Sequence, residues 1–265
     1  MESLFGSSQS AGMKHCDKHG EYEAKSAEFM GKRVVTGCPD CAIDSAAQRD
    51  REFQQELVDN ARQARQRQSE RVMRKAGIPE RFRSKTFADF QPHGDAMMEV
   101  HRLCQVYAER FDDLAQKGTS MIFSGPSGTG KTHLACAIGA RVMEDGRVFM
   151  FTNAYDLLMA VKDTYDKDSD ERESGMIRGF VKPDLLVVDE VDVGLASESD
   201  KRIMFAILNG RYEQMRPTIV MSNLPTEGDS KKLQDVLGAR MFDRLLEGKG
   251  KILHFQGRSQ RTSGN

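Results

Sequence analysis

The chain has 265 residues, of which 30% are charged and 38% hydrophobic, and its formal net charge is −1 at pH 7. This balance excludes a global positive field that would attract nucleic acid, so such binding requires local basic patches. No apolar run reaches the roughly 20 residues of a membrane-spanning helix, and residues 1–12, rich in Ser, lack the apolar core of a secretion signal. We therefore expect a cytoplasmic protein with a disordered tail at residues 1–12.

Residues 13–42 contain two pairs of candidate metal ligands, with the spacing Cys16-x-x-His19 and Cys38-x-x-Cys41. Three thiolates and an imidazole suit tetrahedral Zn²⁺. Because the segment between the pairs has few apolar residues, it can hardly fold without metal. The spacing predicts a zinc-binding module, in which His15 is a rival to His19 as the fourth ligand.

Residues 43–76 are rich in Gln and Arg and contain no Gly or Pro, which predicts a long, charged, exposed helix. Gly77-Ile78-Pro79 ends this pattern, and we place a domain boundary there. Residues 61–85 carry nine Lys or Arg and two acidic residues. This excess can follow a nucleic-acid backbone or an acidic protein surface, or it can simply keep the helix solvated.

From residue 77 onward, short apolar runs alternate with helical patterns. The strands that we predict are 121–123, 148–152, 185–189, 218–222 and 251–255. The helices that we predict are 131–144, 155–165, 200–214 and 231–246, the last broken near Gly238. Apolar strands that alternate with helices are typical of a parallel sheet with both faces covered. The sequence therefore predicts an α/β domain built on a five-stranded parallel sheet with flanking helices.

A phosphate-binding loop of nucleoside triphosphatases is indicated by one motif, Gly125-Pro126-Ser127-Gly128-Thr129-Gly130-Lys131-Thr132. The glycines let several backbone N–H groups point at one phosphate. Lys131 reaches the β- and γ-phosphates, and the Thr132 hydroxyl ligates Mg²⁺. A strand precedes the loop, and a helix that continues with His133 follows it and adds its partial positive charge. We expect ATP and Mg²⁺ to bind here.

Polar side chains are predicted at the ends of two further strands. The apolar run 185–188 leads into Asp189, which can hold Mg²⁺ opposite Thr132, and into Glu190, the natural base to orient an attacking water. The run 218–222 leads into Asn223, which can hydrogen-bond that water or the γ-phosphate. Alternatively, Asn223 only starts a turn, as asparagine often does.

Three further sets of residues are candidates for function. Arg240 and Arg244 lie one helical turn apart, and either can reach the γ-phosphate of a neighbouring subunit or pair with a nearby acid. Lys162 and Tyr165 combine a phosphate contact with a stacking ring, as single-strand binding proteins do, or they are ordinary surface residues. Arg261 follows the last strand and can contact phosphate in cis, or it belongs to a basic tail.

With these residues in view, the chain resembles the bacterial helicase loaders of the DnaC type, within the AAA+ ATPases. The segments that carry the resemblance are Gly77-Ile78-Pro79, Thr86 to Phe90, Ser124 to Ala135, Asp156 to Tyr165, Leu185 to Glu190, Ser222-Asn223 and Gly238-x-Arg240-x-x-Asp243-Arg244. The module at residues 13–42 is similar to those of phage and prophage loaders. The family's closing Gly-x-Ser-aromatic-Arg reads Gly257-Arg258-Ser259-Gln260-Arg261 here, without the aromatic residue.

The resemblance implies an AAA+ P-loop sheet with no large C-terminal lid. The roles that it implies are Glu190 facing the γ-phosphate, Asn223 as sensor 1, Arg240 as the intersubunit arginine finger, Arg261 as sensor 2, and Lys162 and Tyr165 as contacts to single-stranded DNA. It further implies an ATPase domain at residues 77–265 that self-associates. The helical linker 43–76 is then the region that docks on a hexameric replicative helicase.

The function that this resemblance implies is ATP-dependent loading of a replicative helicase onto single-stranded DNA. Two alternatives remain at this stage. One is a transposition-helper ATPase of the IstB type, which assembles on duplex DNA and passes target sites to a transposase. The other is a zinc-dependent adaptor that binds ATP with little hydrolysis.

Overall fold

The computed structural model describes residues 9–29, 32–165 and 172–257, without the side chains of residues 29, 58–59 and 61–73. The chain divides into two compact units, Met1–Gln68 and Ser69–Asn265, called here the N-terminal unit and the C-terminal unit. The division falls inside helix α1 (Pro39–Lys75). Among the helices of the described ranges, none is long and apolar enough to cross a membrane.

The N-terminal unit contains an antiparallel sheet in the order β1-β2-β3, which the sequence analysis did not predict. Its strands are β1 (Gln9–Cys16), β2 (Gly20–Phe29) and β3 (Lys32–Val35). Residues 9–12, expected to be disordered, are part of β1 because they pair with β2: Gln9 is opposite Ser26, and the Ser10 hydroxyl donates to Glu23 at 2.8 Å. Residues 1–8 of the expected tail lie outside the described residues.

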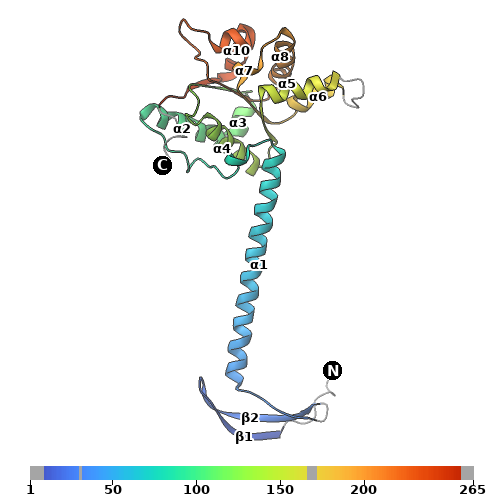
Figure 1. Cartoon of the computed structure of the whole chain (residues 1–265). Coiled ribbons are helices and arrows are strands. Elements are labelled where there is room, and N and C mark those ends of the chain that lie inside the picture. The colour runs from blue at the N-terminus through green and yellow to red at the C-terminus, as the bar shows by residue number, and fades with distance from the viewer. Residues whose placement is uncertain (1–8, 30–31, 166–171, 258–265) are drawn as a thin grey trace. The chain divides into compact units, whose positions relative to one another are not determined.

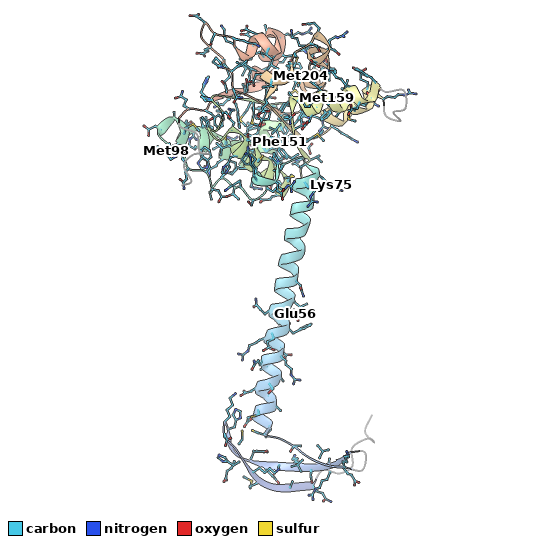
Figure 2. The ribbon with its side chains drawn as sticks, viewed as in Figure 1. Glu56, Lys75, Met98, Phe151, Met159 and Met204 are labelled. Atoms are coloured by element: carbon cyan, nitrogen blue, oxygen red, sulfur yellow. The ribbon has the colours of Figure 1, made fainter. Side chains whose placement is uncertain are left out.

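Helix α1 begins at Pro39, four residues before the predicted start at 43. Proline is favoured at a first helical position because its missing N–H has no partner there in any case. The second cysteine pair is therefore half in a loop and half in the helix, and the backbone N–H of Ala42 donates to the Cys38 carbonyl at 3.2 Å. The helix is polar, and its Phe53, Leu57 and Glu56, the last labelled in Figure 2, are exposed.

The C-terminal unit is built on a five-stranded sheet in the order β5-β6-β7-β4-β8, in which every neighbouring pair is parallel. Its strands are β4 (Met121–Ser124), β5 (Phe149–Asn153), β6 (Leu185–Asp189), β7 (Thr218–Ser222) and β8 (Lys251–His254). These strands confirm the predicted parallel sheet, with ends that differ by one residue at most.

The predicted helix 131–144 is present with the same ends, the other predicted helices are present with shifted ends, and several further helices surround them. The bounds of the larger helices are α2 (Asp95–Glu109), α4 (Lys131–Glu144), α5 (Ala154–Lys162), α6 (Glu173–Val181), α8 (Glu198–Glu213), α9 (Leu233–Leu237) and α10 (Ala239–Leu246). The short ones are α3 (Phe111–Ala115), α7 (Val191–Gly194) and the 3₁₀ turns η1 (Glu80–Phe82), η2 (Asp163–Tyr165) and η3 (Glu247–Lys249). As predicted, the last long helix breaks at Gly238.

Helices cover both faces of the sheet and divide its apolar side chains into two cores. One core joins α2 and α4 to the face that carries Phe123, Val187 and Phe151. The other joins α5, α8 and α10 to the face that carries Val188, with Met204 among its buried residues. Figure 1 shows the two helix layers on opposite sides of the sheet, and Figure 2 places Phe151 and Met204 inside this unit. The carboxyl ends of the central strands thus meet at one edge.

Candidate nucleotide and metal sites

The phosphate loop joins the end of β4 to the start of α4. Gly130, the residue before α4, has a φ of 96°, in the left-handed region that only glycine adopts freely. At Gly125 a Cβ atom would clash with the backbone carbonyl of Phe255, so a side chain there would push the loop away from the sheet. The Thr129 hydroxyl closes the curl by donating to the Pro126 carbonyl at 2.8 Å. The loop therefore forms the curled cradle that its motif predicts.

The ammonium group of Lys131 lies across the phosphate loop and is almost fully buried. It donates to the carbonyl oxygens of Gly125 at 2.6 Å and Pro126 at 3.0 Å. It also donates to the side-chain oxygen of Asn223 at 3.0 Å. A positive charge is thus held over the loop by three oxygens, where it can attract a phosphate.

The hydroxyl of Thr132 and the carboxylate of Asp189 meet at the edge of the sheet. The hydroxyl donates to Asp189 Oδ2 at 3.1 Å, so two oxygen ligands of the kind that Mg²⁺ prefers lie side by side. Burial raises the pKa of Asp189, while hydrogen bonds from the Glu190 N–H and from Thr132 act in the opposite direction. A divalent cation would offset this burial, so the two residues fit Mg²⁺ binding.

Glu190 follows Asp189 and is exposed to the same cleft. Its φ of 53° places a non-glycine residue in the left-handed region, which costs on the order of 1 kcal/mol. The Glu190 N–H donates to Asp189 Oδ1 at 2.8 Å, which fixes this conformation. Backbone strain of this kind is concentrated at functional sites, where it aims a side chain. Here it turns the carboxylate away from the strand and into the cleft.

Asn223 follows β7, which lies between β4 and β6 in the sheet. This strand order brings Asn223 between the phosphate loop and the end of β6. Its side chain accepts from Lys131, and its backbone N–H donates to Asp192 Oδ1 at 3.2 Å. Asn223 therefore contacts both the loop lysine and the segment after Glu190, which a simple turn-starting residue need not do.

The side chains described above line a cleft of about 460 Å³, within the range of small-molecule sites. Its second wall comes from η1 and from the irregular segment that joins η1 to α2. Sequence reasoning missed the residues of this wall, which are Arg81, Phe82, Lys85, Asp89, Gln91 and His93. Two of them, Arg81 and Lys85, had been counted only as part of a basic stretch. Their position follows from the way the segment packs back onto α4, which no local pattern reveals.

The arginines predicted near the γ-phosphate are not among the described residues that line this cleft. Arg240 is exposed on α10, with its guanidinium 5.6 Å from the centroid of the Phe205 ring. Arg244 packs over the Tyr212 ring of its own chain at 4.8 Å. Arg240 is thus the more exposed of the pair. Arg258 and Arg261 lie outside the described residues.

Lys162 and Tyr165 do not share one helix, because α5 ends at Lys162 and Tyr165 lies in the 3₁₀ turn η2. The hydroxyl of Thr164 donates to the Val161 carbonyl at 2.6 Å and helps to end the helix. Lys162 pairs with the buried carboxylate of Asp200, with Nζ and Oδ1 2.5 Å apart. The Tyr165 hydroxyl donates to Glu173 at 3.2 Å, while its ring is exposed. Contact of the two residues with DNA stays a prediction.

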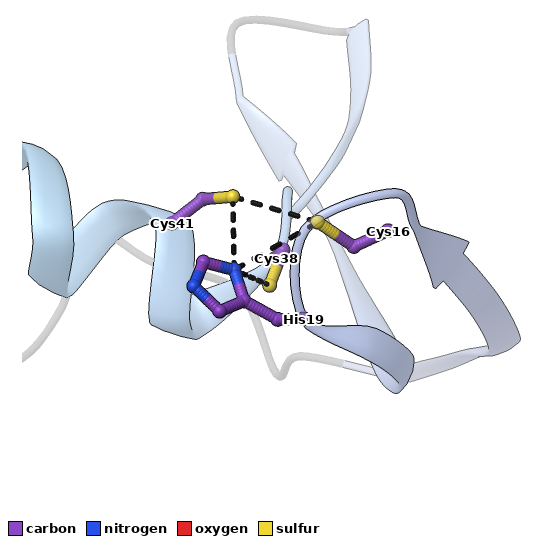
Figure 3. A group of neighbouring side chains, drawn as sticks. All are labelled: Cys16, His19, Cys38 and Cys41. Carbon is purple, nitrogen blue, oxygen red and sulfur yellow. Dashed lines mark hydrogen bonds between the residues drawn. The ribbon is translucent and has the colours of Figure 1, made fainter.

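In the N-terminal unit, the structure brings together one ligand atom from each of Cys16, His19, Cys38 and Cys41, all within 4.8 Å of one another (Figure 3). The Nδ1 atom of His19 lies 3.9, 3.6 and 3.3 Å from the Sγ atoms of Cys16, Cys38 and Cys41, and the Sγ atoms of Cys16 and Cys41 are 3.5 Å apart. His15 lies on β1 outside this group. The geometry therefore selects His19 over its rival.

The spacing of these four atoms fits zinc. Zn–S bonds of about 2.3 Å and Zn–N bonds of about 2.0 Å place tetrahedral ligand atoms about 3.5 to 3.8 Å apart. Backbone N–H groups of Lys18 and His19 donate to the Cys16 sulfur and lower its pKa to about 6, which favours the thiolate that a metal needs. The Nε2 atom of His19 lies 3.1 Å from Asp44, which can fix the ring with Nδ1 free for metal.

The chain is similar to a known family of ATP-binding proteins. The sequence profile of the IstB-like ATP binding proteins matches residues 41–264. The replicative helicase loader DnaC of Buchnera aphidicola subsp. Acyrthosiphon pisum (strain APS) is 32% identical over 192 residues, which are 72% of this chain and 75% of that protein. DnaC of Escherichia coli (strain K12) is 29% identical over 201 residues, 76% of this chain and 79% of that protein.

Solved structures show the same fold. The crystal structure of the DnaC helicase loader superposes with a TM-score of 0.58 at 20% identity, and the match covers 67% of this chain and 100% of that one. The chain therefore shares the fold of that structure, and its C-terminal unit has the parallel five-stranded sheet that the sequence analysis predicted.

Proposed function

The chain belongs to the family of IstB-like ATP binding proteins and DnaC-type replicative helicase loaders, and from this premise we propose that it is an ATP-dependent loader. It places a hexameric replicative helicase on single-stranded DNA. The observation that carries this proposal is the meeting of Lys131, Thr132, Asp189 and Asn223 around one cleft, in a chain 32% identical to a DnaC loader. Each of these residues has a distinct task toward a nucleoside triphosphate.

The residues of the cleft divide the chemistry of hydrolysis among them. Lys131 neutralises charge on the β- and γ-phosphates, and Thr132 and Asp189 would hold a magnesium ion, which would supply further positive charge at the phosphates. Glu190, turned toward the cleft by its backbone, orients a water and takes up its proton. Asn223 contacts Lys131 and so links the γ-phosphate position to the segment after Glu190.

We assign the contacts with a neighbouring subunit, with DNA and with the helicase to surfaces outside the cleft. Arg240, exposed on α10, acts as the arginine finger toward the nucleotide of a neighbouring copy. Lys162 and Tyr165 contact single-stranded DNA, and the linker 43–76 contacts the helicase. The zinc ion held by Cys16, His19, Cys38 and Cys41 stabilises the N-terminal sheet. ATP-bound chains thus hold helicase and DNA together, and hydrolysis releases them.

The partner is tested by affinity capture of the full chain with the replicative helicase of its host, with and without ATP and Mg²⁺. We expect the helicase to be captured and, with ATP, transferred to single-stranded circular DNA. Capture of no helicase in either condition, together with ATP-dependent assembly on duplex DNA, would instead support a transposition helper.

Hydrolysis is tested with Glu190→Gln, which keeps the shape of the side chain and removes the base. We expect turnover to fall at least a hundredfold with ATP binding unchanged. The matched control is Glu227→Gln, an exposed glutamate after β7 that does not line the cleft. Equal turnover in wild type and Glu190→Gln would point to an adaptor that binds ATP without using its hydrolysis.

A further inference from the structure

The wall of the cleft that faces the phosphate loop is irregular yet well anchored. Residues 83–94 form neither helix nor strand, although Lys85, Gln91 and His93 line the cleft. Its backbone hydrogen bonds, such as that from the Phe90 N–H to the Phe87 carbonyl, are local, so the position of the segment against the rest of the unit depends on side-chain bonds and packing. The contacts that hold residues 86–90, called here the wall turn, therefore decide where this wall stands.

Two histidines hold the wall turn from two different helices. The Nε2–H of His133, on α4, donates to the Thr86 carbonyl at 2.8 Å. The Nε2 atom of His101, on α2, lies 3.0 Å from the Phe87 carbonyl and donates to it. Adjacent carbonyls of one turn are thus bonded by imidazoles from separate helices.

Phe90 fills the space between the two histidines. Its ring stacks on His101, with centroids 5.4 Å apart and planes 22° apart. It meets His133 edge-on, with centroids 5.4 Å apart and planes 90° apart. Both Phe90 and His133 are buried. Within the turn, Asp89 accepts from the N–H and hydroxyl of Thr86 at 2.8 and 2.7 Å, which closes it locally.

His133 follows Lys131 and Thr132 directly on α4, so the side chain that bonds the wall turn lies one residue beyond the groups that would hold phosphate and magnesium. We propose that His133 and His101 are positioning residues which clamp the wall turn and so fix the nucleoside side of the cleft relative to the phosphate loop. This inference rests on the proposed ATP site and deepens it. The clamp acts on the base and ribose of the nucleotide, and not on its phosphates.

The test compares ATP with inorganic tripolyphosphate, which has the phosphates but no nucleoside. We expect His133→Leu to weaken ATP binding by the full-length protein about tenfold, the loss that one buried hydrogen bond accounts for, with tripolyphosphate binding unchanged. His101→Leu should act in the same direction, and the double variant should lose less than the product of the two effects. His133→Gln, which keeps a donor, should recover part of the affinity.

Control measurements distinguish failure of the histidine clamp from failure of the ATP site on which it rests. His254→Leu replaces an exposed imidazole on β8 that does not line the cleft, and both affinities should stay at wild-type values. Thermal unfolding midpoints show that each variant is folded at the assay temperature. Equal losses for ATP and tripolyphosphate in His133→Leu, or no loss for either, would overturn the clamp. A wild-type chain that binds neither ligand would overturn the ATP site itself.

Discussion

Replacing Cys41 by serine should unfold the N-terminal sheet and leave the C-terminal unit intact. Among the described residues 9–41, the buried side chains are Ala24, Ser26 and Cys38. Burial of so little apolar surface contributes only about 2 kcal/mol. Metal binding in modules of this kind contributes about 10–16 kcal/mol. Loss of one of the four proposed zinc ligands would therefore remove the main source of order for β1–β3.

The measurement is hydrogen exchange of the full-length protein, read segment by segment by mass spectrometry, with bound zinc quantified in parallel. In Cys41→Ser the amides of residues 9–35 should exchange at the rate of an unfolded chain, and zinc should be absent. The C-terminal unit should keep its protection and its unfolding midpoint. A chelator should produce the same pattern in the wild-type chain.

The matched control is His15→Ala, which removes an exposed imidazole one residue from Cys16 but outside the ligand group. It should retain zinc and protection. The reasoning is refuted if metal-free Cys41→Ser still protects the amides of the sheet, or if His15→Ala loses zinc as Cys41→Ser does.

Three further predictions concern charged side chains of the C-terminal unit. Asp200→Asn frees Lys162 from its ion pair, so the carboxylate no longer competes with DNA phosphates for this lysine. The affinity for single-stranded DNA, measured by fluorescence anisotropy, should then rise about threefold to tenfold. An equal rise in Glu198→Gln, which removes the same charge from an exposed position nearby, would contradict this competition. Although burial opposes it, hydrogen bonds from Lys162 and Ser197 lower the pKa of Asp200 to about 2. A lowered pKa contributes stability above the unfolded-state pKa of about 3.9, and this contribution is lost as the pH falls toward 2. We therefore expect the free energy of unfolding, measured by chemical denaturation, to fall between about pH 5 and about pH 2 by roughly 2 kcal/mol more in the wild type than in Asp200→Asn. Parallel pH profiles of the two proteins would disprove the assignment. Finally, Arg240→Ala should lower ATP turnover of the assembled protein about 10³-fold or more. Arg244→Ala should mainly lower the free energy of unfolding, by about 1 kcal/mol, because the Arg244 guanidinium packs on Tyr212. Wild-type turnover in Arg240→Ala would exclude Arg240 as the arginine finger.

The sheet of the C-terminal unit was predictable because its strands are short, continuous apolar runs that end in polar residues. The run before Asp189 shows this, since Leu185 to Val188 are all buried. The position of the phosphate loop between a strand and a helix was equally predictable, because its residues are contiguous. The wall of the cleft was not, because Phe82 and Gln91 belong to a segment without periodicity whose place is set by side-chain bonds from distant helices.

The N-terminal unit shows the opposite case. The clustering of Cys16, His19, Cys38 and Cys41 could be predicted from their spacing, but the strands of this unit could not. Strand patterns depend on one face being buried, and here β1 and β3 have no buried side chain among the described residues. Lys162 illustrates a third limit, since its partner Asp200 is 38 residues away in the sequence and no local motif links them.

The position of Cys41 in the opening turn of α1 has a consequence for the helix itself. A helix usually begins at a side chain that caps its free N–H groups, and such a start frays easily. Here two sulfur atoms, one just before the helix and one inside its first turn, would be tied to the same ion. The ion would then set the residue at which coiling begins and the direction in which the chain leaves the sheet. A polar helix of 37 residues would gain a fixed origin from this.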